Sequence, residues 1–288
     1  GKKTDRRNVE KIVKLDKVRA KRISDAYAEA KSDPNNNEVK RAYSAMIKET
    51  IAQYKEIISD GYTLEISEQE YNNSEDMINN LIEDKNMRIF STEDGFGVEG
   101  ITEADRKSNP MLKKTNFKDK NGQPLLVNDV FRFVHDFFGH AKMGNGFGPL
   151  GEENAWNIHS RMYSPLARRA VTTETRGQNS WVNFSGVNDA AFAIRNEARK
   201  LRTEAQKTTD PAERNRLLVK AKKIVDEGYN TIAFAEQKVM LLAEEFTKTD
   251  NEISQSRQQQ DQPQSRQQKS LDEVINEGRK NHFKDATI

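Results

Sequence analysis

The 288-residue chain contains no cysteine, which excludes disulfide bonds and any metal site built from thiolates. A chain without cysteine fits a reducing compartment. It also has no apolar run of the roughly 18–20 residues that a membrane-spanning helix needs, and its first residues do not resemble a signal peptide. We therefore expect a water-soluble protein without a membrane-spanning segment.

A large net charge is also missing, because 47 Lys and Arg residues face 45 Asp and Glu residues. The whole chain therefore gives little electrostatic reason for non-specific DNA binding. Basic residues nevertheless gather near the start, where residues 1–22 hold ten Lys or Arg and three Asp or Glu. This region can contact nucleic acid, although a solvated helix face is the more ordinary interpretation.

Composition and periodicity divide the chain into three parts. Helical spacing over 8–31 and 38–59, with a polar break between them, predicts a basic helical hairpin spanning residues 1–60. We expect this hairpin to bury little surface against the rest. Residues 61–246 predict a mainly helical core. From residue 247 to 288 the chain is rich in Gln, which predicts a flexible tail with a short terminal helix at 270–283.

The predicted fold class is mainly α with a small antiparallel β element, and α+β is the alternative. Alternating residues over 62–67 and 86–92 predict two short strands with a helix between them. Aromatic-rich residues 128–143 predict a helix of the core. Residues 188–208 and 211–246 predict two long helices, the second opening with a proline at a favoured position.

Three of the four histidines fall within one 25-residue stretch: His135, His140 and His159. Glu174 follows in the sequence TTETRG. Two His at short spacing with a carboxylate downstream can bind a divalent metal, and these ligands suit Fe, Mn or Zn better than Mg or Ca. A spacing of five separates two side chains by about 140° on a regular α-helix. The helix must therefore loosen between the two His, which Gly139 permits.

The segments HDFFGH and TTE resemble the iron site of the aromatic amino-acid hydroxylases, where two His and a later Glu hold the metal. The resemblance implies that His135, His140 and Glu174 are the metal ligands, with iron favoured over zinc. It covers about forty residues and departs from the family pattern at Asp136 and in the shorter run to the Glu. No counterpart of the family's pterin-binding segments is present.

A longer block, residues 109–238, is similar to a domain of very large (polyvalent) proteins of tailed bacteriophages that are packaged in the virion and delivered with the DNA. The segment TETRGQNSWVNF carries much of this resemblance. It implies other virion proteins as partners, and a location in the virion interior or, after delivery, in the host cytoplasm.

Further residues near the motif have predicted roles. We expect Asp136 and Glu152 to support the ligands or act as a general base, and Arg176 to position substrate. His159 is either an additional ligand or a structural partner. The polar and bulky residues expected to contact substrate, or alternatively to cap a helix, are Gln178, Asn179 and Trp181.

Three functions remain open from the sequence. The leading hypothesis is a virion-associated protein with a two-His, one-carboxylate metal centre, which if active would be a non-haem iron oxygenase or hydroxylase. A zinc-dependent hydrolase would use the same ligands. The third is a structural or cargo protein in which His135 pairs with Glu174 and His140 with Glu152 as a buried polar cluster.

Overall fold

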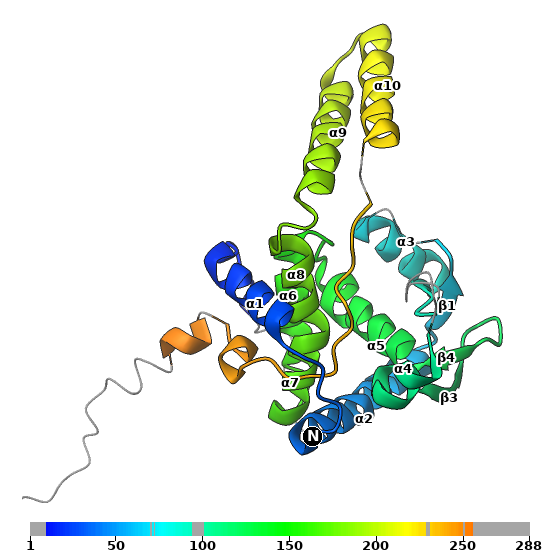
Figure 1. Ribbon diagram of the computed structural model, residues 1–288. Helices are drawn as coiled ribbons and strands as arrows, with labels where there is room; N and C mark the ends of the chain where they lie inside the picture. The colour runs from blue at the N-terminus through cyan, green and yellow to red at the C-terminus, as the bar shows by residue number, and fades with distance from the viewer. Residues whose placement is uncertain are drawn as a thin grey trace, which may run out of the picture. The chain divides into compact units, whose positions relative to one another are not determined.

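The computed structural model describes residues 10–69, 71, 73–93, 101–228, 231–249 and 251–255 (Figure 1). The chain separates into two compact units at Thr247 and Lys248, which is where the sequence predicts the tail to begin. The Gln-rich stretch and the predicted terminal helix at 270–283 lie outside the described residues. None of the described helices combines the length and apolar character that crossing a membrane requires.

The fold is mainly helical with a small β element, as the sequence predicts. The first half of the described chain contains α1 (Lys17–Glu29), α2 (Asn37–Ser59), β1 (Thr63–Ser67), α3 (Ser74–Asp84), β2 (Asn86–Phe90), α4 (Glu103–Ser108), η3 (Pro110–Leu112), β3 (Lys114–Lys118) and β4 (Pro124–Leu126). The second half contains α5 (Val127–His135), η4 (Asp136–His140), η5 (Ala141–Met143), α6 (Pro149–Ser160), α7 (Pro165–Thr172), η6 (Thr173–Gly177), α8 (Gln178–Phe184), α9 (Asp189–Lys207), α10 (Pro211–Glu227) and η7 (Glu244–Thr247).

The first two helices do not form the predicted separate hairpin. The α1 helix packs against α8, whereas α2 packs against α5 and α7. The reason is the apolar face of α2, on which Val39, Tyr43 and Met46 recur at helical spacing and are all buried. The expectation that residues 1–60 bury little surface against the core is therefore wrong, because α2 forms part of that core.

The four strands make two separate pairs. The predicted strands β1 and β2 run parallel, not antiparallel as expected, in a register that places Thr63 opposite Asn86. Helix α3 connects them. Such a crossover helix brings the chain back to the start of the first strand, so that the second strand runs in the same direction. The antiparallel pair is β3 with β4, which the sequence did not predict. Its tight connection includes Gly122 at a φ of 85°, a value that favours glycine.

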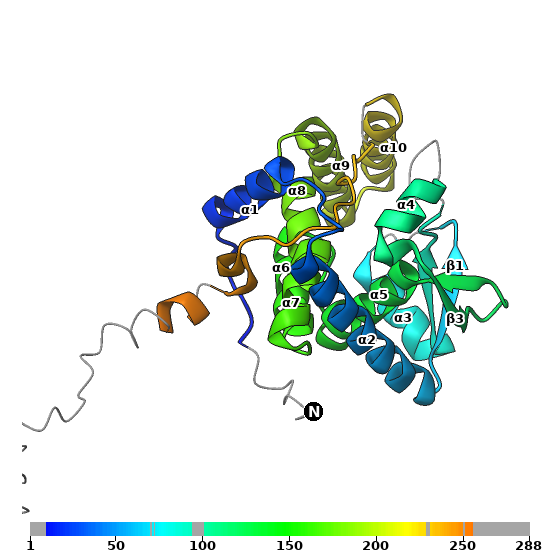
Figure 2. The same cartoon turned by 60° about the horizontal axis from the view of Figure 1, so that its bottom comes forward.

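Two continuous runs of helix, together with α6, form the centre of the first compact unit. One run consists of α5, η4 and η5, and the other of α7, η6 and α8; η4 and η6 are each one π-helical turn. Helix α6 packs against both of these π turns. Figures 1 and 2 place α3 and the strands on one side of α5, and α1, α6, α7 and α8 on the other.

The chain after α10 differs from the prediction of a helix reaching residue 246. Helix α10 ends at Glu227, and residues 231–243 are not helical (Figure 1). The Lys238 ammonium donates to the carbonyl oxygens of Tyr27, Ala28 and Ala30 at the end of α1, where a cation is favourable. Tertiary contacts of this kind hold residues 231–243 against α1. The periodicity of the sequence cannot predict them.

Candidate metal centre

The π turn η4 brings His135 and His140 onto one face of their helix. A π turn pairs residues five apart, so side chains at this spacing lie one above the other. The two imidazole rings have centroids 5.3 Å apart. Gly139 lies where the turn meets α6: a Cβ at this position would be 3.0 Å from the Cβ of Ala155 and 3.1 Å from its carbonyl oxygen. The expected loosening of the helix between the two His is thus present.

A buried group that can hold a metal ion consists of His135, Asp136 and His140. Each residue offers one ligand atom, and these atoms all lie within 4.8 Å of one another. His135 is 7% exposed and His140 is 1% exposed. Two imidazoles and one carboxylate are a ligand set that suits a divalent transition metal.

Hydrogen bonds fix which nitrogen of His135 is available. The Oε1 atom of Gln53 lies 3.2 Å from Nε2 of His159, and the Nδ1 atoms of His159 and His135 are 3.0 Å apart. An amide oxygen only accepts, so His159 carries its proton on Nε2 and accepts a hydrogen bond from the Nδ1–H group of His135. The Nε2 atom of His135 is then an unprotonated lone pair, the form that binds metals.

This lone pair is an exception to the usual satisfaction of buried polar atoms. Nε2 of His135 is buried and has no hydrogen-bond partner among the described residues. Burial, together with the neighbouring His159 and His140, lowers the pKa of His135 well below its ordinary value. His135 is therefore neutral at physiological pH, as a metal ligand must be.

His140 is oriented by a second outer contact. Its Nδ1–H group donates to the carbonyl oxygen of Asn145 at 3.2 Å, and its Nε2 atom is 3.4 Å from Oε2 of Glu152. Burial disfavours the charged imidazole, but the carboxylates of Glu152 and Asp136 outweigh it and raise the pKa of His140 to about 9. Burial raises the pKa of Asp136 to about 6. A metal ion must therefore displace a proton from His140 to bind there.

Glu174 is not brought to the His pair. It lies in the other π turn, η6, where Oε1 accepts a hydrogen bond from Tyr43 at 2.5 Å and Oε2 accepts one from Gln178 at 2.9 Å. Burial raises its pKa to about 7, although these hydrogen bonds act in the opposite direction. The carboxylate that the structure groups with the two His is that of Asp136, and the expectation that Glu174 is a ligand stays a prediction. Of the two pairs expected in a structural cluster, the structure forms the one between His140 and Glu152.

Helix α6 connects the two π turns. It carries His159, which contacts His135, and Glu152, whose Oε2 atom also accepts a hydrogen bond from Asn179 at 2.8 Å. His159 is completely buried, and both of its ring nitrogens have polar neighbours. It therefore acts as a partner of His135 in this arrangement and not as an additional ligand.

Arg176 has contacts within the protein that account for its position. Its guanidinium lies 3.8 Å from the centre of the Trp156 ring, and it forms an ion pair with Glu153. It also donates to the carbonyl oxygen of Phe246 at 2.7 Å. With 4% of its surface exposed, Arg176 holds α6, η6 and η7 together, and a role in positioning substrate has no support from these contacts.

The expected substrate contacts are engaged in the same way. Gln178 donates to Glu174 and Asn179 to Glu152, whereas Trp181 packs, half-buried, on the apolar cluster around Tyr27. These contacts give the three residues structural roles at α8.

Sequence reasoning missed Gln53, which lies on α2, 82 positions before His135 along the chain. The available signal was a polar side chain on the apolar face of a helix, between Met46 and Ile57. Such a residue needs a buried polar partner, which is here His159.

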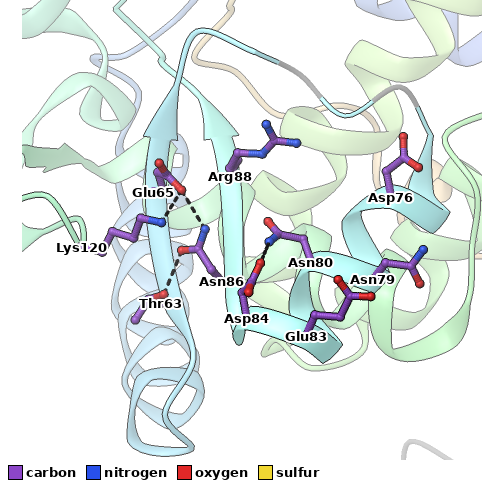
Figure 3. A pocket seen from close by; sticks show the side chains of 10 residues that line it. All are labelled: Thr63, Glu65, Asp76, Asn79, Asn80, Glu83, Asp84, Asn86, Arg88 and Lys120. Atoms are coloured by element: carbon purple, nitrogen blue, oxygen red, sulfur yellow. Dashed lines mark hydrogen bonds and ion pairs between the residues drawn. The ribbon is translucent and has the colours of Figure 1, made fainter.

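A polar hollow of about 660 Å³ lies elsewhere, over β1, β2 and α3 (Figure 3). Glu65 on β1 pairs with Lys120 and also accepts a hydrogen bond from Asn86, while Asn80 donates to Asp84. None of the residues that line the hollow belongs to the His135, Asp136 and His140 group. The hollow is therefore a feature separate from the candidate metal centre.

Comparison with known proteins adds one partial similarity. Residues 187–238, which include α9 and α10, match a family of unknown function, DUF6381. No curated protein and no solved structure matches the chain. The matched segment does not contain the candidate metal centre.

Proposed function

We propose that this protein binds a divalent transition metal through Nε2 of His135, Nε2 of His140 and the carboxylate of Asp136. The buried, unpartnered Nε2 atom of His135 carries this proposal. Nε2 of Gln53 is also buried without a partner among the described residues, but the lone pair of His135 differs in belonging to a group with a carboxylate and a second imidazole. A cation at this point would satisfy the lone pair and would also be coordinated by the neighbouring carboxylate and the second imidazole.

Iron is the metal that this ligand set favours. Two His and one carboxylate on one face leave coordination positions for oxygen and for substrate, the arrangement of non-haem Fe(II) oxygenases. Bound iron would supply oxygen activation. The protein would supply the two oriented imidazoles and Glu152 next to His140 to hold or release a proton. We therefore propose a non-haem iron oxygenase or hydroxylase.

The position of Glu152 also favours a second function, zinc-dependent hydrolysis. Its carboxylate lies beside a proposed metal ligand without itself belonging to the ligand group. A carboxylate in this place can accept a proton from a water molecule whose pKa a zinc ion lowers to about 7. The identity of the bound metal separates the two functions.

Metal analysis of the purified protein tests the site. We expect about one equivalent of iron or zinc per chain after exposure to a mixture of divalent metals, and loss of that metal in His140→Ala and Asp136→Asn. Glu174→Gln is the matched control, because it changes another buried carboxyl group of the same motif and should retain the metal. Absence of metal from the wild type, together with a sharply lower melting temperature for His140→Ala, would instead indicate a structural polar cluster.

The setting of this activity is a further part of the proposal. The block 109–238 that resembles a phage-delivered domain contains the whole metal group. It supports a protein that is packaged in a virion, acts there or in the host cytoplasm after delivery, and has other virion proteins as partners. Mass spectrometry of purified particles would detect the chain if this setting is correct.

A further inference from the structure

The hairpin formed by α9 and α10, which pack against each other, has a basic surface (Figure 1). Residues 195–223 hold ten Lys or Arg and four Asp or Glu, whereas the rest of the chain holds 37 Lys or Arg and 41 Asp or Glu. The hairpin is therefore strongly positive within a chain that is almost neutral. All ten of its basic residues are exposed. An anionic partner can reach them without displacing another part of the described chain.

Apolar residues determine which face of α9 meets α10. Ala198, Leu201 and Ala205 recur at helical spacing on α9 and are buried. Ala198 and Leu201 belong to one apolar cluster with Ala221 of α10. This face of α9 is therefore covered, and the two flanks beside it remain open.

Three arginines, Arg195, Arg199 and Arg202, lie along one flank of α9. Their spacings of four and three residues place them in a single stripe. The acidic residues of the same stretch, Glu197 and Glu204, are about 140–180° away around the helix, at 100° per residue. Helix α9 therefore has a positive flank, the α9 arginine stripe, and a negative flank opposite to it.

The α9 arginine stripe is not neutralised by carboxylates of the described chain. On α10, Arg216 pairs with Glu213. By contrast, no carboxylate among the described residues forms an ion pair with an arginine of the stripe, and the acceptor for Arg199 is the neutral amide of Asn196, at 3.0 Å. A guanidinium stays charged at physiological pH and matches the oxygens of a phosphate group in bidentate geometry. The stripe therefore offers three charges to an external phosphate ligand.

The spacing of the stripe favours a chain of phosphates over a single phosphate group. Arg195 and Arg202 are about 10 Å apart along the helix axis, at a rise of 1.5 Å per residue. The phosphates of one strand of a duplex recur about every 3.4 Å along its axis, so a row of guanidinium groups can contact several of them. A membrane surface fits less well, because a helix that lies in a bilayer interface needs an exposed apolar face, and α10 covers that of α9.

We propose that the α9 arginine stripe binds the phosphate backbone of a nucleic acid duplex. Contacts to phosphates hold the duplex without reading its base sequence. The site lies apart from the His135, Asp136 and His140 group, and the proposal does not depend on metal binding.

Fluorescence anisotropy of a labelled DNA duplex of about two helical turns tests the site with the full-length protein at several salt concentrations. The triple variant Arg195→Gln, Arg199→Gln, Arg202→Gln removes the three charges. Gln has a helix propensity close to that of Arg, so circular dichroism should show an unchanged helix content. We expect the affinity to fall at least about tenfold at low salt, and the slope of log K against log salt to become about three units shallower. An RNA duplex of the same sequence, titrated in parallel, shows which nucleic acid binds more tightly.

Two matched variants make this test specific. Lys at all three positions of the stripe keeps the charges and should keep the salt slope of the wild type. A second triple variant, Lys40→Gln, Lys48→Gln, Lys55→Gln, removes the same charge from exposed positions of α2 and should leave the affinity within about twofold of the wild type.

Four results would overturn the proposal. They are no binding of either duplex by the wild type, an unchanged affinity of the α9 variant, an equal loss of affinity in the α2 variant, and tighter binding of the wild type to vesicles that contain phosphatidylserine than to both duplexes.

Discussion

Replacing Glu174 by Gln tests the electrostatics of the second π turn and the composition of the metal site together. Burial raises the pKa of the Glu174 carboxyl from 4.5 to about 7. The group therefore binds a proton more tightly in the folded than in the unfolded state. Between pH 4.5 and about 7 the folded state carries more protons, so the free energy of unfolding falls as the pH rises through this window.

The expected size of this effect follows from the same pKa. At about 1.4 kcal/mol per pH unit, the rise from 4.5 to about 7 corresponds to a loss of about 3 kcal/mol in the wild type above pH 7. Gln has nearly the same shape, can accept the hydrogen bond from Tyr43, and does not titrate. The variant should therefore lack this part of the pH dependence. For a folded unit of this size the difference corresponds to a shift of about 6–12 °C in melting temperature.

Urea unfolding of both proteins at several values between pH 4.5 and 8.5 measures the effect, with metal content determined on the same samples. Subtracting the two curves isolates Glu174, because His140 and Asp136 titrate in both proteins. Parallel curves across the whole range would show that the pKa of Glu174 is not raised. Loss of metal in Glu174→Gln would show that Glu174 is a ligand and that the ligand set proposed above is wrong.

Three further variants probe the surroundings of the site. Gly139→Ala places a Cβ against α6 and should cost about 1–3 kcal/mol of stability in thermal unfolding, whereas Gly146→Ala, which meets only ordinary contact at 3.8 Å, should cost less than 1 kcal/mol. Gln53→Leu should weaken metal affinity about 10–100-fold in a competition titration, and Gln53→Glu should retain it, because a carboxylate still accepts the ring N–H of His159. Equal affinities for these two Gln53 variants would contradict the hydrogen-bond chain. Arg176→Lys should lower the free energy of unfolding by about 2–4 kcal/mol and leave the metal content unchanged. The reason is that Lys cannot replace a guanidinium that stacks on Trp156 and forms several hydrogen bonds. Loss of metal without loss of stability would refute this structural role.

Local patterns were sufficient for much of the fold. Alternating side chains predicted β1 and β2, and the helical spacing of apolar residues predicted α2 and α3 close to their observed bounds. The clustering of His135 and His140 with Gly139 between them indicated a loosened helix, and a π turn is found there. These features depend on residues near one another in sequence, whose backbone preferences and side-chain periodicity act locally.

Tertiary contacts determine which side chains lie next to the two His and to Glu174. The fold brings Gln53 on α2 to His159 on α6, and through His159 it orients the ring of His135, although 82 positions separate Gln53 from His135. Packing of α2 against α7, which continues into η6, brings Tyr43 to Glu174 and gives that carboxyl a hydrogen-bond partner.

The sequence by itself therefore determined which residue types are available for metal binding and that the helix carrying them must deform. Only the tertiary structure placed the carboxylate of Asp136 with the two His and gave Arg176 its contacts with Glu153 and Phe246. The physical reason is that a short motif fixes spacing along one helix. A buried charge or lone pair finds its partner on a segment that packs against it and that can be distant in sequence. Which segment packs there depends on the whole core.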